Sequence, residues 1–146
     1  MNRKNKNKEQ YNILLVDDNE GVRNAFAFFL KNLRNFIFEI EKAASGEAAV
    51  EMVKEDNFGF IFMDYSMPPG MSGPEAIKLI KKIKPGIKIL GISSYTEAGV
   101  VEQMMNAGAD GYLIKNFGKH EIPEAIKTVQ AGGFYYSPEI KKLLDV

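Results

Sequence analysis

The fold of this chain is indicated by one short stretch, Ile13-Leu14-Leu15-Val16-Asp17-Asp18. Four consecutive apolar residues predict a strand buried on both faces, which is typical of a parallel sheet placed between helices. The two aspartates that follow could by themselves cap the next helix, because acidic side chains favour helix N-termini. Their meaning therefore depends on the rest of the chain.

Apolar runs and stretches with helical spacing alternate from Tyr11 onward. The predicted strands after the first are 36–43, 58–63, 87–92 and 111–114. The first predicted helix covers 19–32. The second is capped by Ser45, and the third begins at the capping box Ser72-Gly-Pro-Glu75. The last three cover 96–106, ended by Gly108, 119–131, and 138–144, a short closing helix with Ser137 as its cap. Five strands alternating with helices predict an α/β fold, a five-stranded parallel sheet with helices on both faces.

The composition is that of an ordinary globular domain. The chain has 146 residues, 45% hydrophobic and 26% charged, which suits one domain with a single core. Its 19 Lys plus Arg balance 19 Asp plus Glu, so there is no general attraction to nucleic acid or anionic membrane. Cysteine is absent, which excludes disulfides and thiolate metal sites.

The first ten residues are polar and rich in Asn and Lys. They lack the apolar stretch of a signal peptide, and no run in the chain approaches the roughly 20 apolar residues that span a bilayer. We interpret residues 1–10 as a disordered polar tail, with a basic anchoring arm as the alternative. We expect a cytoplasmic protein without a membrane segment.

Polar side chains follow the ends of four predicted strands. Asp17 and Asp18 follow the first strand, Asp64 the third, Ser93 closes the fourth, and Lys115 follows the fifth. The carboxyl ends of parallel strands share one edge of the sheet, where ligands bind in such folds, so we expect these side chains to converge.

Three carboxylates at one point repel each other, and a hard divalent cation relieves that repulsion. Oxygen ligands completed by water suit Mg²⁺. Three carboxylates, one lysine and Mg²⁺ are neutral together, so the site can accept a phosphoryl group of about −1.5 to −2 charge.

Four pieces of sequence at these strand ends resemble response-regulator receiver domains of two-component signalling: Ile13-Leu-Leu-Val-Asp-Asp18, Ile61-Phe-Met-Asp-Tyr-Ser-Met-Pro68, Ile89-Leu-Gly-Ile-Ser93 and Ala107-Gly-Ala-Asp-Gly-Tyr-Leu-Ile-Lys115. The resemblance covers 11–133. The ending Ala131-Gly-Gly-Phe-Tyr-Tyr-Ser-Pro138 is similar to receivers that precede a LuxR-type helix-turn-helix. The resemblance to receiver domains implies the doubly wound, flavodoxin-like strand order 2-1-3-4-5. It also implies that 134–146 form a short helix or the start of a linker.

The resemblance also implies roles for the acidic residues. Asp64 would be the nucleophile that accepts the phosphoryl group. Asp64 and Asp18 would bind Mg²⁺ directly, Asp17 directly or through water, and the backbone carbonyl of Ser66 would be a further metal ligand. No other cofactor is implied. The domain would catalyse only its own phosphorylation and dephosphorylation, and it would not be an enzyme acting on another substrate.

The remaining site residues follow in the same way. Lys115 would pair with one phosphoryl oxygen, and Ser93, with Ser94 as the alternative, would donate to another. Tyr112 matches the aromatic switch position, although a buried aromatic on a strand is also common without a role. Ser66 and Tyr95 match positions that tune the lifetime of the phosphoryl group.

Two features depart from the family pattern. The loop Met67-Pro-Pro-Gly-Met-Ser-Gly73 is one residue longer than usual. Lys115 is followed by Asn116 where the family commonly has a cis proline. A cis bond before a residue other than proline costs about 2.5–4 kcal/mol, so we expect a trans bond here.

The implied partners are a sensor histidine kinase or phosphotransfer protein. We interpret the aromatic cluster of Phe26, Phe28 and Phe29 as core residues together with a kinase-docking edge, and not as a cofactor site. A downstream protein would bind the face of the fourth helix, fifth strand and fifth helix. Pairing of two copies is left open. We expect no sequence-selective DNA binding by this chain alone, because no helix-turn-helix follows Ser137 and the net charge is zero.

Three other functions fit this sequence less well. A flavodoxin-like flavin site needs an uncharged phosphate-binding loop after the first strand, where this chain has Asp17 and Asp18. A haloacid-dehalogenase-type phosphatase needs a second Asp two residues after the nucleophile, and Ser66 stands there and cannot act as the acid. A scaffold with a relic site conflicts with the complete set of site residues.

Overall fold

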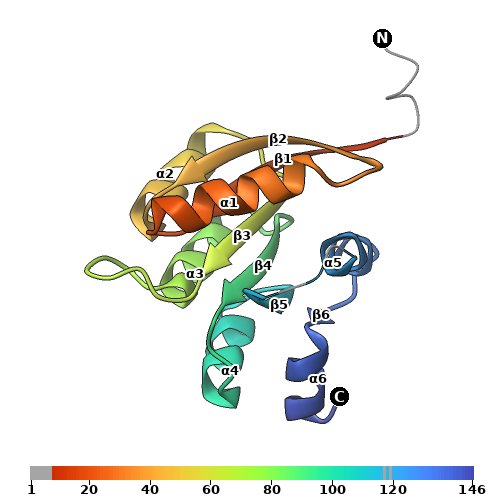
Figure 1. Ribbon diagram of the computed structural model, residues 1–146. Helices are drawn as coiled ribbons and strands as arrows, with labels where there is room; N and C mark the ends of the chain where they lie inside the picture. The colour runs from red at the N-terminus through yellow and green to blue at the C-terminus, as the bar shows by residue number, and fades with distance from the viewer. Residues whose placement is uncertain (1–7, 117, 119) are drawn as a thin grey trace.

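The computed structural model describes residues 8–116, 118 and 120–146. Within them, six parallel strands form one sheet in the order β2-β1-β3-β4-β5-β6 (Figure 1). The strands are β1 (Glu9–Val16), β2 (Phe36–Ala43), β3 (Phe60–Asp64), β4 (Lys88–Ser93), β5 (Gly111–Ile114) and β6 (Tyr135–Tyr136). The α/β class and the order of the first five strands are confirmed.

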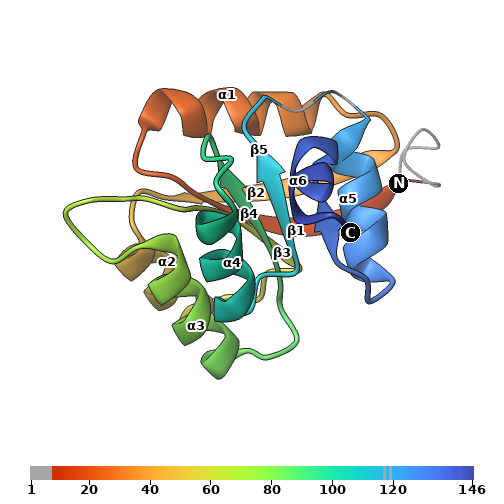
Figure 2. The ribbon, with the colours of Figure 1, turned by 90° about the horizontal axis from the view of Figure 1, so that it is seen from below.

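Helices cover both faces of this sheet. They are α1 (Glu20–Lys31), α2 (Gly46–Glu55), α3 (Gly73–Ile83), α4 (Ala98–Ala107), α5 (Glu121–Gln130) and α6 (Pro138–Leu144). Figure 2 shows α1 on one side of the sheet and α2, α3 and α4 on the other. One core lies between the sheet and α1 with α5, and a second lies between the sheet and α2, α3, α4 and α6.

The predicted helix ends are largely present. The Ser45 hydroxyl accepts a hydrogen bond from the Ala48 N–H at 3.1 Å. Ser72 and Glu75 form the predicted capping box. Gly108 ends α4 with φ of 119°, a left-handed conformation that a side chain disfavours. Both α4 and α5 begin two residues later than predicted, and Lys119, the predicted start of the latter, lies outside the described residues.

Two residues of the predicted N-terminal tail lie in a strand. Strand β1 begins at Glu9, and Glu9 and Gln10 pair with Phe36 and Ile37 of β2. These two residues are ordered because β2 is long enough to extend the ladder past Tyr11. Residues 1–7 of the predicted tail lie outside the described residues.

The C-terminal segment forms a sixth strand that the sequence pattern does not predict. Tyr135 and Tyr136 pair with Gly111 and Tyr112, so β5 is not the edge of the sheet. Helix α6 then packs against α4, with the Ile140 side chain fully buried in the core that α4 shares. The segment 134–146 is therefore part of the domain's packing.

Ser137 has a different role from the predicted one. It stands at the N-cap position of α6 but makes no capping bond with its side chain. Its hydroxyl instead donates to Glu121 Oε1 at 2.6 Å and accepts from the Ile114 N–H at 3.0 Å. Three elements, β5, α5 and α6, are joined by this buried serine.

None of the helices formed by the described residues is long and apolar enough to cross a membrane.

Candidate functional site

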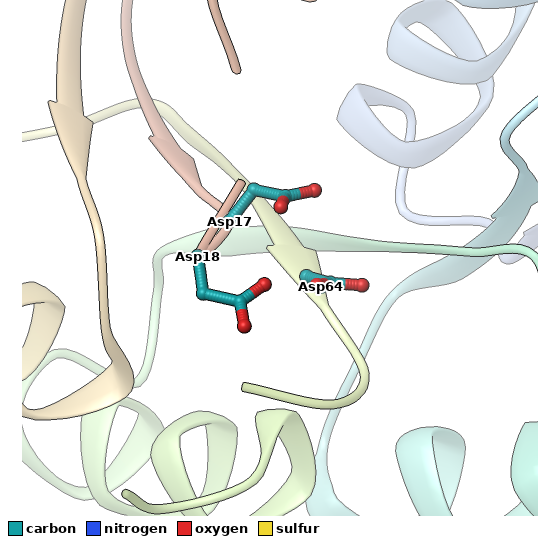
Figure 3. Close-up of side chains that lie close together, drawn as sticks. All are labelled: Asp17, Asp18 and Asp64. Atoms are coloured by element: carbon teal, nitrogen blue, oxygen red, sulfur yellow. The ribbon is translucent and has the colours of Figure 1, made fainter. Parts of the chain in front are cut away.

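The three predicted carboxylates lie together at the carboxyl edge of the sheet. Val16 of β1 pairs with Met63 of β3, so Asp17 and Asp64 follow at neighbouring strand ends. Figure 3 shows the side chains of Asp17, Asp18 and Asp64 gathered at these ends. One carboxylate oxygen from each lies within 4.8 Å of the other two. This spacing brings three oxygen ligands within reach of one small cation.

Lys115 closes the other side of this cluster. Its backbone N–H donates to the Ser93 carbonyl at 3.0 Å, which places it at the end of β5. Its ammonium lies 3.0 Å from Asp17 Oδ2 and 3.3 Å from Asp64 Oδ1. Of the five side chains that the sequence predicted to converge, the three carboxylates and the lysine therefore do converge.

The two neighbouring aspartates have unequal freedom. Asp17 is nearly buried, and its carboxylate accepts from the Asn19 N–H at 2.8 Å as well as from Lys115. Arg23 donates to the Asp17 carbonyl at 2.6 Å, a contact the sequence analysis missed. Asp18 is exposed, so its oxygens are more open to a solvated metal ion.

Asp64 carries the strongest electrostatic perturbation of the site. Burial raises its pKa to about 6, and the negative charge of Asp17 adds to that rise. Lys115 and the Tyr65 N–H, which donates to Asp64 Oδ1 at 2.9 Å, act in the opposite direction. At neutral pH the carboxyl is ionised, as a nucleophile must be, and below about pH 6 it becomes protonated.

The pKa of Lys115 is also shifted. Burial acts to lower it, but the hydrogen bond to Asp17 and the charge of Asp64 outweigh burial, so the pKa is raised. Lys115 is therefore cationic at neutral pH. The Lys115–Asn116 bond is trans, as predicted, and within the described part of the chain the cis bond is Pro68–Pro69.

Comparison with known families agrees with this geometry. The model of the response regulator receiver domain matches residues 13–127. The chain belongs to that family. Its first and last matched residues enclose every predicted site residue, from Asp17 to Lys115.

Curated relatives of this receiver domain are transcriptional response regulators. It is 37% identical over 123 residues to the transcriptional activator protein ExaE of Pseudomonas putida, covering 84% of this chain and 56% of the relative. It is 35% identical over 129 residues to the response regulator UvrY of Escherichia coli (strain K12), covering 88% and 58%. The chain thus spans just over half the length of these relatives.

A solved structure supports the same assignment. A two-component response regulator of the LuxR family from Aurantimonas sp. SI85-9A1 superposes with a TM-score of 0.83 at 26% identity, covering 92% of this chain and 94% of that one. The resemblance to receivers of the LuxR type is therefore confirmed at the level of both sequence and fold.

The predicted switch residue of the receiver, Tyr112, is fully buried. Its hydroxyl donates to the Tyr95 carbonyl at 2.6 Å, and burial is the main cause that raises its pKa. Ser93 is buried too, and its hydroxyl oxygen accepts from the Tyr95 N–H at 3.0 Å. The Ser93 side chain also hydrogen-bonds the Tyr112 side chain, which acts to lower the pKa of Tyr112. The phosphoryl contact predicted for Ser93, with Ser94 as the alternative, stays a prediction.

The loop after Asp64 carries the remaining predicted ligand. Ser66 is partly exposed two residues past the acceptor, and metal binding by its carbonyl stays a prediction. The longer loop over 67–73 is held from α2, because the Met71 N–H donates to the Glu47 carboxylate. That bond lowers the pKa of Glu47.

The donor set fits Mg²⁺. Receiver domains generally bind this ion at an acidic pocket, and here the clustered ligand atoms of Asp17, Asp18 and Asp64 are all carboxylate oxygens. The three carboxylates and the Lys115 ammonium leave a net charge of −2, which a divalent cation neutralises.

Tyr65 is a residue that sequence reasoning missed. It directly follows Asp64, its ring meets that of Tyr95 edge to face at 5.4 Å between centroids, and its hydroxyl donates to Gln103 Oε1 of α4 at 2.6 Å. The available signal was an aromatic residue one past the acceptor together with another two past Ser93.

Proposed function

We propose that this receiver domain accepts a phosphoryl group on Asp64 from the phosphohistidine of a sensor histidine kinase or of a phosphotransfer protein. One observation carries the proposal. The Asp64 carboxylate, perturbed to a pKa of about 6, lies at a strand end between the Lys115 ammonium and the carboxylates of Asp17 and Asp18. Such perturbed groups held by specific charges are typical of reacting residues.

The reaction forms one bond and breaks one. An ionised Asp64 oxygen attacks phosphorus to form a P–O bond, while the bond from phosphorus to the donor breaks and its electron pair leaves with the donor. Lys115, already within 3.3 Å of Asp64, is placed to neutralise a phosphoryl oxygen. Ser93 would donate its hydroxyl proton to another. Catalysis is positioning and charge neutralisation.

Asp18, Asp17, Asp64 and the Ser66 carbonyl would hold Mg²⁺. When bound, the ion neutralises the crowded carboxylates and the charge of the incoming phosphoryl group. We propose Asp18 as a direct ligand because it is exposed, and Asp17 as a direct or water-mediated one because Lys115 and Asn19 already use its oxygens.

The donor protein would approach beside α1. A pocket of about 350 Å³ lies there, with apolar walls from α1 and the sheet and with Asp17, Asp64 and Lys115 at its end. Val22 and Phe28 of α1 are exposed, at 39% and 72%. An apolar helix of a kinase or phosphotransfer protein can pack on this edge while its histidine reaches Asp64.

The surface proposed to bind a downstream protein differs from the one that the sequence predicted. Strand β6 pairs with β5 and α6 packs on α4, so the predicted face of α4, β5 and α5 is partly covered by the chain's own segment 134–146. We propose that a downstream protein contacts α4 together with α6.

Because its positive and negative charges balance, we propose that this chain alone does not bind DNA sequence-selectively. We also propose a cytoplasmic location.

Labelling of Asp64 tests the proposal. Acetyl phosphate with Mg²⁺ should add one phosphoryl mass to the wild-type chain, measured on the intact protein, and none to Asp64→Asn. The matched control is Asp145→Asn, at an exposed carboxyl past the end of α6, which should be labelled like the wild type. Label on Asp64→Asn would disprove the assignment.

A further inference from the structure

Tyr95 is held in place by two other tyrosines. The Tyr112 hydroxyl donates to the Tyr95 carbonyl at 2.6 Å and so fixes its backbone. The Tyr65 ring packs edge to face against the Tyr95 ring, with the planes at 67°. Tyr95 is itself 46% exposed on a loop, and its ring packs against the ring of Tyr65.

Tyr65 is in turn held at both ends. Its backbone N–H donates to Asp64 Oδ1 at 2.9 Å, and its backbone carbonyl accepts from the Gly73 N–H at 2.7 Å. Its hydroxyl donates to Gln103 of α4 at 2.6 Å. The Tyr65 ring is therefore a fixed support, while the Tyr95 ring that leans on it is at the surface.

We infer that Tyr65 is a positioning residue for the phosphoryl lifetime, because its ring, one residue past the acceptor Asp64, holds the Tyr95 ring in place. The inference rests on the proposed function and deepens it. An aspartyl phosphate is lost when water attacks phosphorus in line with the bond to Asp64, and a bulky side chain kept at the entrance slows that approach. Tyr65 provides the contact that keeps the ring there.

The size of the effect follows from the contact. Edge-to-face pairs contribute an energy that corresponds to about a two- to tenfold change in a rate when the contact is lost. Tyr65→Ala should therefore speed phosphate loss by about two- to tenfold. Tyr65→Phe keeps the ring and loses only the bond to Gln103, so it should restore most of the slow decay.

The experiment measures first-order loss of the phosphoryl group, after acetyl phosphate is removed, by intact-protein mass. Tyr65→Ala, Tyr65→Phe, Tyr95→Ala and the double alanine variant are compared with the wild type. Tyr65→Ala and Tyr95→Ala should each decay faster, and the double variant should decay no faster than Tyr95→Ala. Phe134→Ala, at an aromatic residue that is 64% exposed near β6, is the control and should decay like the wild type.

Other results have separate meanings. If the wild type takes up no label, the proposed function fails. If it is labelled but Tyr65→Ala decays at the wild-type rate, if Tyr95→Ala does not change the decay, or if the two effects multiply, the inference is overturned. A purely structural role of Tyr65 would lower the melting temperature without the rescue by Tyr65→Phe, and that outcome overturns it too.

Discussion

Asp64 and Glu121 are both nearly buried carboxyl groups, 7% and 9% exposed, yet their surroundings are opposite in character. Asp64 stands at the acidic edge of the sheet, where Asp17, Asp18 and Asp64 cluster, and the like charge of Asp17 adds to the effect of burial that raises its pKa to about 6. Glu121 stands at the β5–β6 end, where its carboxylate accepts the Ser137 hydroxyl at 2.6 Å.

The two carboxyl groups therefore affect the stability of the domain in different ways. At Asp64 the fold keeps an ionised group where burial and repulsion oppose the charge, which costs stability and leaves room for a cation and a phosphoryl group. At Glu121 the polar groups satisfy one another, and they join the C-terminal segment to β5 and α5. Removing polar groups at the two places should therefore have opposite effects on unfolding.

The largest expected effect is at the C-terminal end. Ile140→Ala removes a fully buried side chain between α6 and α4, and should lower the free energy of unfolding by about 2–5 kcal/mol in a urea titration. Leu143→Ala, at a residue that is 49% exposed on the same helix, is the control and should cost less than about 1 kcal/mol. Equal, small losses would show that α6 contributes little to the fold.

Next in size is the buried serine. Ser137→Ala leaves the Ile114 N–H and the Glu121 carboxylate without this partner, and should destabilise the domain by about 1–3 kcal/mol. Ser94→Ala removes an exposed hydroxyl and serves as the control. If Ser137→Ala has the same urea midpoint as the wild type, water replaces the serine at no cost. The Glu121–Ser137 site would then not stabilise the fold, and its proposed difference from Asp64 would be wrong.

Asp64→Asn should act in the opposite direction. The folded pKa of about 6 exceeds the usual 3.8, so the stability due to the protonated carboxyl is complete below about pH 3.8 and is lost as pH rises through about 6. At pH 7 with chelator, Asp64→Asn should therefore be more stable than the wild type by about 1–2 kcal/mol. The gain should vanish toward pH 4.

Two further conditions sharpen that result. Saturating Mg²⁺ should shrink the difference, because the ion stabilises the wild-type fold that binds it. Asp145→Asn, at an exposed carboxyl away from the acidic cluster, is the matched control at both pH values. A destabilised Asp64→Asn at pH 7 would mean that the bond to Lys115 outweighs burial and the repulsion from Asp17.

The smallest expected effect concerns the metal. Asp18→Asn should weaken Mg²⁺ binding by about tenfold, equal to about 1.4 kcal/mol, and Asp17→Asn by less, because Lys115 and Asn19 already engage the Asp17 carboxylate. An NMR titration ranks the two variants, and the wild-type affinity should fall below about pH 6 as Asp64 is protonated. Unchanged affinity in both variants would place the ion elsewhere.

The cluster of charged residues at the carboxyl edge of the sheet was predictable from the sequence, because it depends only on which residues follow each strand. Each of Asp17, Asp64 and Lys115 directly follows a short apolar run, and in a parallel sheet every such position lies at one edge. The convergence needed no knowledge of side-chain packing. The trans bond after Lys115 was likewise predictable, because it depends on the cost of a local isomer.

The opposite end of the sheet was not readable in this way. Strand β6 is two residues long, too short for any periodicity, and it exists only because β5 offers free backbone groups at its edge. Ser137 has the local signature of a helix cap, but its hydroxyl is taken by Glu121 and Ile114. Tyr65 likewise meets Tyr95 through contacts between separate loops.

By itself the sequence determined the parallel α/β fold, the family and the set of groups at the acidic edge, because strand alternation and strand ends are properties of short segments. Only the tertiary structure decided where the C-terminal segment packs, which partner Ser137 takes, how far the pKa of Asp64 is raised, and which ring holds Tyr95. These depend on burial and on distances between residues far apart in the chain, and no local pattern encodes them.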